Sequence, residues 1–268
     1  MINWNATYAV FRREFEGYFA TPLAYVFIII FLLAMGSFTF YFGQFYATGR
    51  AELDVFFGFH PWLYLFLLPA ISMRLWAEEQ KSGTIELLMT LPISVTSAVL
   101  GKFLAAWAFA GIALMLTFPM WLTVNYLTFP QDGGFWHQIG QIIFLGWPGS
   151  PDNGVIFAGY IGSWLMAGGY LAIGSCLSAL TNNQVIAFVL TVVVCFMFTI
   201  SGHEIVLDFF QGWAPLTLVD TISSFSFLTH FAAIMEGVID LRDLMFFGSL
   251  IGLFLFINVI VIDQKRAG

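Results

Sequence analysis

Residues 153–203 read NGVIFAGYIGSWLMAGGYLAIGSCLSALTNNQVIAFVLTVVVCFMFTISGH and contain no Asp, Glu, Lys or Arg. A membrane-spanning helix needs about 20 mostly apolar residues to cross a hydrocarbon core about 30 Å thick, so this run is too long for one helix. The polar turn Thr181-Asn182-Asn183-Gln184 divides it. The stretch therefore predicts two consecutive membrane spans and an all-α, polytopic membrane protein.

The composition of the whole chain agrees with this prediction. Of the 268 residues, 60% are hydrophobic and 9% are charged, and the mean hydropathy is +0.88. A soluble domain carries about 25% charged residues, so this surface is not suited to water alone. The net charge of −7 leaves no basic stripe, which argues against nucleic acid as a partner. A signal peptide would have an apolar core near the N-terminus, but this region contains the charged residues Arg12, Arg13, Glu14 and Glu16. No cleaved signal peptide is therefore predicted.

Four further runs lack Asp, Glu, Lys and Arg: residues 17–49, 55–73, 103–131 and 244–262. Each is long enough for one span. Together with the two spans above, they predict six transmembrane helices within one domain that covers residues 1–268. Their expected ranges are 22–45, 57–75, 99–126, 155–180, 185–201 and 244–262.

The basic residues predict the orientation of these spans. An even number of spans places both termini on one side, and seven of the nine Lys and Arg residues lie on that side, with only Arg50 and Arg242 opposite. Because basic residues are retained on the cytoplasmic side, both termini and the loop at 76–98 are predicted to be cytoplasmic. The opposite face holds ten of the sixteen carboxylates, which we interpret as tolerance of acidic residues outside rather than attraction of cations.

The first 20 residues form a separate pattern. Large aromatic residues recur every three or four positions from Trp4 to Tyr18, with charged residues mostly between them. This spacing predicts an amphipathic helix that lies in the cytoplasmic interface with its rings at headgroup depth. A plain membrane anchor and a docking surface for a cytoplasmic partner both fit the pattern. The residues assigned to this helix are Trp4, Tyr8, Phe11, Arg12, Arg13 and Phe15.

Two other segments carry structural predictions. Residues 202–243 are too long for a turn and too apolar for a soluble loop, and Gly212 and Pro215 would break a helix there. We expect two short helices that dip into the outer leaflet as a re-entrant hairpin between spans five and six. Within 155–180, Gly, Ala and Ser recur at a spacing of four, which predicts close packing against other helices of the same chain, with a dimer seam as the alternative.

Several kinds of chemistry are missing from the sequence. His203-Glu204-Ile205-Val206-Leu207 lacks the second His of a zinc protease motif, and neither GxSxG nor the phosphate-binding pattern GxxxxGK[ST] occurs. We therefore expect a non-enzymatic chain that binds no cofactor and does not hydrolyse ATP itself. The predicted span interiors lack ionisable groups, which argues against an ion-coupled transporter. Four histidines, at 60, 137, 203 and 230, leave metal handling as an alternative, although their spacing matches no standard ligand pattern.

The most informative segment is Arg74-Leu-Trp-Ala-Glu-Glu-Gln-Lys-Ser-Gly-Thr-Ile-Glu-Leu-Leu-Met-Thr-Leu-Pro-Ile-Ser94. Gly83 interrupts the helix that leaves span two, and Ser82 or Thr84 can cap a new short helix. Glu86 would lie in the first turn of this short helix, where the positive N-terminal end favours a negative charge, and Pro92 would end the helix. Ile85, Leu88 and Leu91 would share one face, which could rest on lipid or fill the groove of a partner.

Here the sequence resembles the permease subunits of ABC-2 type transporters, whose loop between spans two and three has a similar EExxSGTxExLLxxLPxS pattern. It looks closest to the gliding-motility-type branch, which is related to permeases of copper-enzyme maturation. The blocks that carry this likeness begin with Thr21-Pro22, Pro69-Ala70, Leu180-Thr181 and Gly237-Val238. They are spread along nearly the whole chain, so the resemblance covers one complete permease domain.

The resemblance implies an exporter in the inner membrane of a bacterium, made of two permease and two separate ATPase subunits. The second permease would be identical to this chain or different from it, and a periplasmic auxiliary protein is a further candidate partner. Substrate would be exported or extracted from the membrane. Separately from the resemblance, the uncharged spans rich in Phe make a lipid-like substrate one candidate. A structural anchor for an envelope assembly is the rival function. The resemblance also implies that residues 78–92 form a coupling helix seated in the ATPase, with contacts from Glu78, Glu79, Lys81, Ser82, Gly83, Thr84, Ile85, Glu86, Leu88, Leu91 and Pro92.

Overall fold

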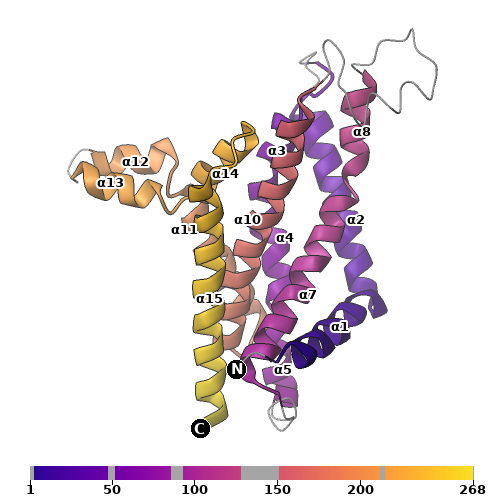
Figure 1. Cartoon of the computed structure of the whole chain (residues 1–268), viewed down its shortest axis with the longest axis vertical. Helices are drawn as coiled ribbons and strands as arrows, with labels where there is room; N and C mark the ends of the chain where they lie inside the picture. The colour runs from indigo at the N-terminus through magenta and orange to yellow at the C-terminus, as the bar shows by residue number, and fades with distance from the viewer. Residues whose placement is uncertain (1–2, 48–51, 86–92, 128–150, 212–214, 268) are drawn as a thin grey trace.

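The computed structural model describes residues 3–47, 52–85, 93–127, 151–211 and 215–267, and every regular element within them is a helix. The chain forms an elongated bundle with both termini at one end (Figure 1). The elements are α1 (Trp4–Ala20), α2 (Pro22–Ser37), the π-helix η1 (Phe38–Phe42), α3 (Asp54–Gly58), α4 (His60–Ser72), α5 (Arg74–Ser82), α7 (Val95–Met115), α8 (Phe118–Leu127), α10 (Asn153–Leu180), α11 (Gln184–Ile200), α12 (Glu204–Gln211), α13 (Leu216–Ser223), α14 (Phe227–Met235) and α15 (Leu241–Ala267).

Four stretches in the described residues are long and apolar enough to cross a membrane, fewer than the six predicted. They are Ala24–Phe42, Val95–Leu127, Asn153–Leu180 and Leu241–Lys265, and a fifth is obtained if α13 and α14, bent by 67°, count as one span. The other two predicted spans correspond to shorter helices, α4 with 13 residues and α11 with 17. The protein is thus a multi-pass helical membrane protein, and the count of six stays a prediction.

Breaks occur within two predicted spans, and the first of them accounts for part of this difference. The segment predicted at 57–75 is divided among α3, α4 and α5, with interruptions at Phe59 and Met73. The segment predicted at 99–126 is α7 followed by α8, with a break at Leu116 and Thr117. Pro119 follows that break, and proline has no N–H to donate and crowds the preceding turn. Charge-free length alone did not reveal these breaks.

α10 forms the centre of the bundle and is buried along most of its length. Its small residues let neighbouring helices approach closely: a Cβ at Gly174 would lie 1.9 Å from Oγ of Ser72 on α4, and one at Gly162 would lie 2.8 Å from Ile234 on α14. The small-residue stripe therefore packs against helices of the same chain, as the sequence predicted. Tyr170 on the same helix is fully buried, and its hydroxyl lies 2.6 Å from the Thr199 hydroxyl of α11.

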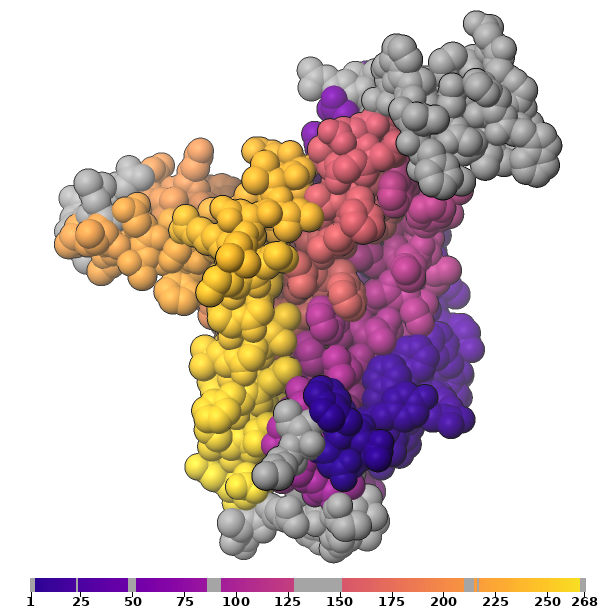
Figure 2. Space-filling view, viewed as in Figure 1, coloured from indigo at the N-terminus to yellow at the C-terminus, as the bar shows by residue number. Residues whose placement is uncertain are grey.

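The segment between α11 and α15 differs from the prediction in its number of helices. Three short helices, α12, α13 and α14, stand where two were expected. α12 and α13 project from the side of the bundle (Figures 1 and 2), and Ile205 and Phe209 on α12 are exposed. Pro215 immediately precedes α13, in line with its expected role as a helix break, while Gly212 lies outside the described residues. A re-entrant hairpin stays a prediction for this segment.

α1 lies obliquely across the lower end of the bundle, next to α7 (Figure 1). Its first turn is capped by Asn3, whose side chain accepts hydrogen bonds from the backbone of Asn5 and Ala6. The contact with α7 depends on Gly101, because a Cβ there would lie 2.7 Å from Cβ of Val10. A helix is thus present where the amphipathic helix was predicted, and it is fixed to the body of the protein; its place in the membrane interface stays a prediction.

Candidate functional site

α5 continues the chain from α4 toward the predicted coupling segment, and its first turn is held by α10. Backbone N–H groups at the start of a helix have no partner within that helix. The Ser178 hydroxyl accepts from the N–H of Trp76 at 3.2 Å and of Ala77 at 3.0 Å, and donates to the carbonyl of Met73 at 2.8 Å. A residue about one hundred positions away therefore caps α5 and spans the break between α4 and α5.

Further contacts fix the rest of α5 to the bundle. The indole N–H of the buried Trp76 points to Oγ of Ser175, 3.3 Å away. The Gln80 amide donates to the Ala179 carbonyl at 2.9 Å and accepts from the Lys265 ammonium of α15 at 2.7 Å. One side of α5 is thereby bonded to both α10 and α15.

A buried lysine joins α5, α7 and α1. The side chain of Lys102, one turn into the apolar part of α7, is 2% exposed. Its ammonium donates to Glu79 of α5 at 2.8 Å and to Glu14 of α1 at 3.1 Å, and it lies 5.3 Å from the centre of the Trp76 ring. Arg13 adds a 2.5 Å ion pair to Glu14. A buried ammonium requires such partners because an unpaired charge is strongly disfavoured away from water.

Two carboxyl groups of this region, Glu14 and Glu78, have a lowered pKa. Burial alone would raise the pKa of the Glu14 carboxyl, but the neighbouring Lys102 and Arg13 hold it below its ordinary value of 4.5. On α5, the hydrogen bond from Arg74 holds the pKa of the Glu78 carboxyl below its ordinary value. The geometry of that pair is bidentate, with N···O distances of 2.7 and 3.0 Å.

α5 ends at Gly83, which adopts φ = +71° in the left-handed region. A side chain would disfavour this conformation, so glycine is suited to the position. The Ser82 hydroxyl donates back to the carbonyl of Glu78 at 2.9 Å and lies 2.9 Å from the Thr84 hydroxyl. The chain therefore turns sharply at the place where the sequence predicted an interruption.

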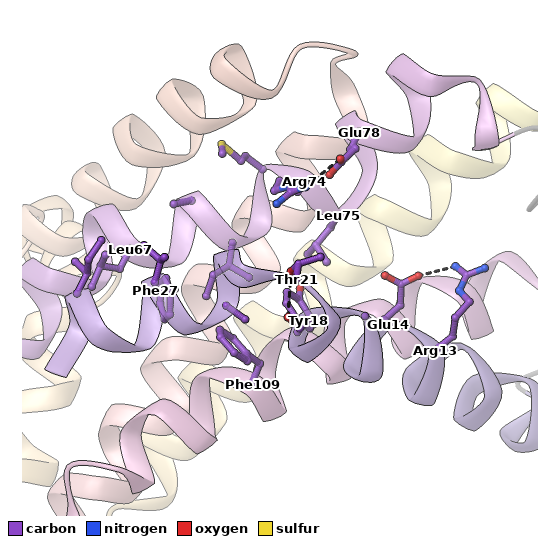
Figure 3. Close-up of a pocket in the computed structure, with 17 residues that line it drawn as sticks. Arg13, Glu14, Tyr18, Thr21, Phe27, Leu67, Arg74, Leu75, Glu78 and Phe109 are labelled. Carbon is purple, nitrogen blue, oxygen red and sulfur yellow. Dashed lines mark hydrogen bonds and ion pairs between the residues drawn. The ribbon is translucent and has the colours of Figure 1, made fainter.

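A cavity of about 420 Å³ lies between α1, α2, α4, α5 and α7. One end of it is lined by charged side chains of α1 and α5, and the other by apolar side chains that include Phe27 of α2 and Leu67 of α4 (Figure 3). Tyr18 of α1 lies between the two ends and stacks on Phe109 of α7, with ring centres 4.9 Å apart. The cavity thus has a polar and an apolar end.

The sequence model of the ABC-2 family transporter proteins matches residues 66–262, more than half of the chain. The chain belongs to the ABC-2 transporter family. Members of this family are membrane components of transporters and are not themselves catalytic, so this chain has the role of a transport permease. The match includes α5, α7, α10 and most of α15, while α1 and α2 precede it. No curated protein sequence matches the permease.

The residues predicted to contact an ATPase occupy different environments in the permease. Glu78 pairs with Arg74, and Glu79 is turned inward to Lys102. Ile85, expected on the partner-facing side, is half-buried and packs against the core of the permease. Four other predicted contact residues are exposed: Lys81, Ser82, Gly83 and Thr84. The last four lie outside the described part of the chain: Glu86, Leu88, Leu91 and Pro92.

The predicted aromatic face of α1 is largely directed away from the protein. Trp4 and Tyr8 are 69% and 64% exposed, and Phe11 and Phe15 are half-buried in a stack with ring centres 5.5 Å apart. The opposite face, with Thr7 and Val10, packs on the bundle. Arg12 pairs with Glu16 on the exposed surface, whereas Glu14 contacts the buried Lys102, so α1 has both an outward aromatic surface and an inward charged contact.

At the opposite end of the bundle, two of the four histidines are buried inside the protein. His60 is fully buried at the start of α4, and its Nδ1 lies 3.1 Å from the carbonyl of Phe56. His230 is buried against Asp243 at the start of α15, at 2.6 Å. The described residues hold no group of three His, Cys, Asp or Glu side chains able to bind a metal ion, and His137 lies outside them. Metal handling therefore gains no support from these residues.

Sequence reasoning missed the charged contact among Glu14, Glu79 and Lys102. It placed Lys102 among the cytoplasmic basic residues and assigned Glu79 to an ATPase surface. One signal was available: Lys102 stands within an otherwise apolar helical run beside Gly101, a residue small enough to admit another helix. An ionisable residue in such a place commonly has a buried partner. The identity of that partner could not be read from the sequence, because Glu14 is 88 positions away.

Proposed function

We propose that this permease is the membrane half of an ATP-driven exporter, in which a separate ATPase subunit acts through residues 78–92 to export a substrate or extract it from the membrane. The placement of α5 supports this proposal. α5 is bonded to α10 and α15, lies at the end of the bundle with α1 and both termini, and stops at a glycine turn that leads into the predicted coupling helix (Figure 1). A partner that moves this segment would act directly on the bundle.

The proposed assembly contains two permease and two ATPase subunits in a bacterial inner membrane, with residues 1–268 of each permease acting as one domain. The sequence blocks that begin at Thr21, Pro69, Leu180 and Gly237 favour the gliding-motility-type branch of the family for this permease. Membership of that branch does not imply that the cell glides. Both termini and the segment at 76–98 would face the cytoplasm. Single cysteines at Ser82 and Gln264 should therefore label only from the cytoplasm, and one at Asp152 only from outside. Labelling of Ser82 from outside would overturn this orientation.

Co-purification is the decisive experiment for the proposed function. The permease, solubilised mildly from its native membrane, should bring down an ATPase that contains the phosphate-binding loop it lacks, identified by mass spectrometry. A structural anchor would instead bring down envelope proteins without an ATPase. Repeated absence of an ATPase under conditions that keep the permease folded would reject the exporter proposal.

The face of the coupling helix can be tested with one matched pair of variants. If Leu88 enters an apolar groove of the ATPase, Leu88→Asp buries an unpaired carboxylate and should abolish co-purification. Thr90→Asp introduces the same charge two positions later, about 200° around a helix and thus on the opposite face, and should leave the complex intact. Equal co-purification of both variants would reject the assignment of this face.

Gly83 tests coupling separately from assembly. No heavy atom lies within 4 Å of the position of an added Cβ, so a substitution there acts on backbone conformation alone. Gly83→Val disfavours the positive φ and should redirect the segment after α5, which leaves the complex assembled but its ATP hydrolysis insensitive to substrate. Gly83→Asn tolerates the left-handed region better and should retain most of the coupling. Identical behaviour of the two variants would exclude a role for this turn.

A further inference from the structure

We propose that the cavity between α1, α2, α4, α5 and α7 holds the headgroup and part of one acyl chain of a membrane phospholipid with a zwitterionic headgroup, whose headgroup lies between α1 and α5 while the rest of its tails remains in the bilayer. This inference concerns the permease in its bilayer and does not require an ATPase partner. Its volume of about 420 Å³ is within the range of about 300–1,000 Å³ common for small-molecule sites.

The apolar end of the cavity opens toward lipid. Val26 and Ile30 of α2 line it, yet they are 49% and 48% exposed. α2 belongs to a candidate membrane span, and Tyr25, Ile29 and Leu33 continue the same exposed apolar surface. In a membrane these side chains face hydrocarbon, so an acyl chain can enter sideways without crossing water. Phe27, Leu67 and Phe109 form the inner wall that would contact it.

The polar end lies where a headgroup would be. Arg13 and Glu14 come from α1, whose outward aromatic face fits the interface between headgroups and tails, and Arg74 and Glu78 come from the first turns of α5. In Figure 3 these four side chains occupy one end of the cavity, and Phe27 and Leu67 occupy the other. A two-part ligand with a charged head and an apolar tail matches this division.

The charges at the mouth select the class of headgroup. Two guanidinium groups and two carboxylates line it, so its net charge is zero, and the adjacent pair of Lys102 and Glu79 adds no net charge. A phosphate can approach Arg13 or Arg74 while an ammonium approaches Glu14 or Glu78. A purely anionic headgroup would meet two carboxylates without an ammonium to offset them, and a purely cationic one would meet two guanidinium groups.

The test measures lipid retained by the permease purified in mild detergent. After partial delipidation, phosphatidylethanolamine or phosphatidylglycerol is added back and the bound lipid is counted by native mass spectrometry. We expect one phosphatidylethanolamine to be retained, with a preference over phosphatidylglycerol of about fivefold, the scale of one partly exposed ion pair. Equal retention of both lipids, or retention of neither, would overturn the proposal.

Charge variants separate a headgroup site from a structural ion pair. Glu78→Gln leaves the mouth with one excess positive charge, so it should shift the preference toward phosphatidylglycerol. Arg74→Gln leaves one excess negative charge and should weaken retention of both lipids. If Glu78→Gln folds, judged by its elution as a single species, and keeps the wild-type preference, the headgroup assignment is wrong.

A second pair of variants tests the tail site. Ala70→Phe adds a ring to a half-buried residue that lines the cavity, so it should reduce retained phosphatidylethanolamine about fivefold or more. Ile29→Phe adds a ring to the exposed side of α2, outside the cavity lining, and should leave retention unchanged. Equal retention by these two variants would place the lipid elsewhere. None of these readouts depends on ATPase association, so failure here and failure of the proposed function can be told apart.

Discussion

Replacing Lys102 by Met removes the ammonium from the contact among α1, α5 and α7 while it keeps an unbranched side chain of similar length. Glu14 and Glu79, which accept from that ammonium at 3.1 and 2.8 Å, are then left facing each other in a largely buried place. Removal of one partner from a buried ion pair costs about 3–5 kcal/mol. Both carboxylates keep some contact with water and Arg13 still pairs with Glu14, so we expect a loss of about 3 kcal/mol, the low end of that range.

Unfolding of the purified variant in detergent measures this loss, and hydrogen exchange locates it. The N–H groups of α1 should lose protection more than those of α10, because α1 is held to α7 by this contact and by the close approach at Gly101. The triple variant Lys102→Met, Glu14→Gln, Glu79→Gln removes all three charges and should recover most of the stability, since neutral replacement of a buried ionic group is often tolerated.

Two results would refute this reasoning about Lys102. One is a loss below about 1 kcal/mol in the single variant, the value expected for an exposed ion pair. The other is a triple variant no more stable than Lys102→Met, which would show that the cost comes from lost packing of the lysine stem rather than from uncompensated carboxylates.

Three further predictions concern other contacts. Ser178→Ala leaves two N–H groups of α5 without their cap and should cost about 1–2 kcal/mol, with faster hydrogen exchange at Trp76; unchanged exchange would contradict the capping role. The ring nitrogens of buried His230 lie 2.6 Å from Oδ1 of Asp243 and 2.9 Å from the carbonyl oxygen of Ser224; His230→Leu leaves both oxygens without this partner and should cost about 1–3 kcal/mol in unfolding experiments, and adding Asp243→Asn should recover part of it. The pKa of Glu14 is lowered on folding, so its contribution is complete above pH 4.5 and is lost as the pH falls through the lowered value. Glu14→Gln should flatten that acid part of the stability curve, and a parallel curve would contradict the assignment.

The parts of the fold that the sequence predicted are those set by local rules. Helical class, the amphipathic helix at the N-terminus and the turn at Gly83 follow from periodicity, composition and the conformational freedom of glycine. The breaks at Phe59 and Met73 were missed, because a hydrophobic run gives no sign that its helix is interrupted when a tertiary partner such as Ser178 satisfies the freed backbone groups.

The candidate site was predicted less completely for the same reason. The pattern around Gly83 marked the segment, but it gave every charged residue there an outward role. Glu79 instead turns inward, because Lys102 needs a carboxylate to balance a charge buried in the bundle. The orientation of Glu79 is decided by Lys102, which lies 23 positions away on another helix. Helical periodicity within residues 78–92 therefore could not predict this orientation.

The two sides of α5 differ in how firmly they are held, and this difference sets how a displacement of the segment after Gly83 would spread. On one side, hydrogen bonds to Ser178 and Ala179 and from Lys265 fix α5 to α10 and α15. The ion pair of Glu79 with Lys102 joins α5 to α7 as well, and the remaining side faces the cavity, with α2 beyond it. A helix bonded on one side and open on the other moves together with its bonded neighbours, while the open side accommodates the change in spacing. A push on α5 would therefore carry α7, α10 and α15 and alter the distance across the cavity to α2, which places the proposed lipid where it would oppose or favour that motion.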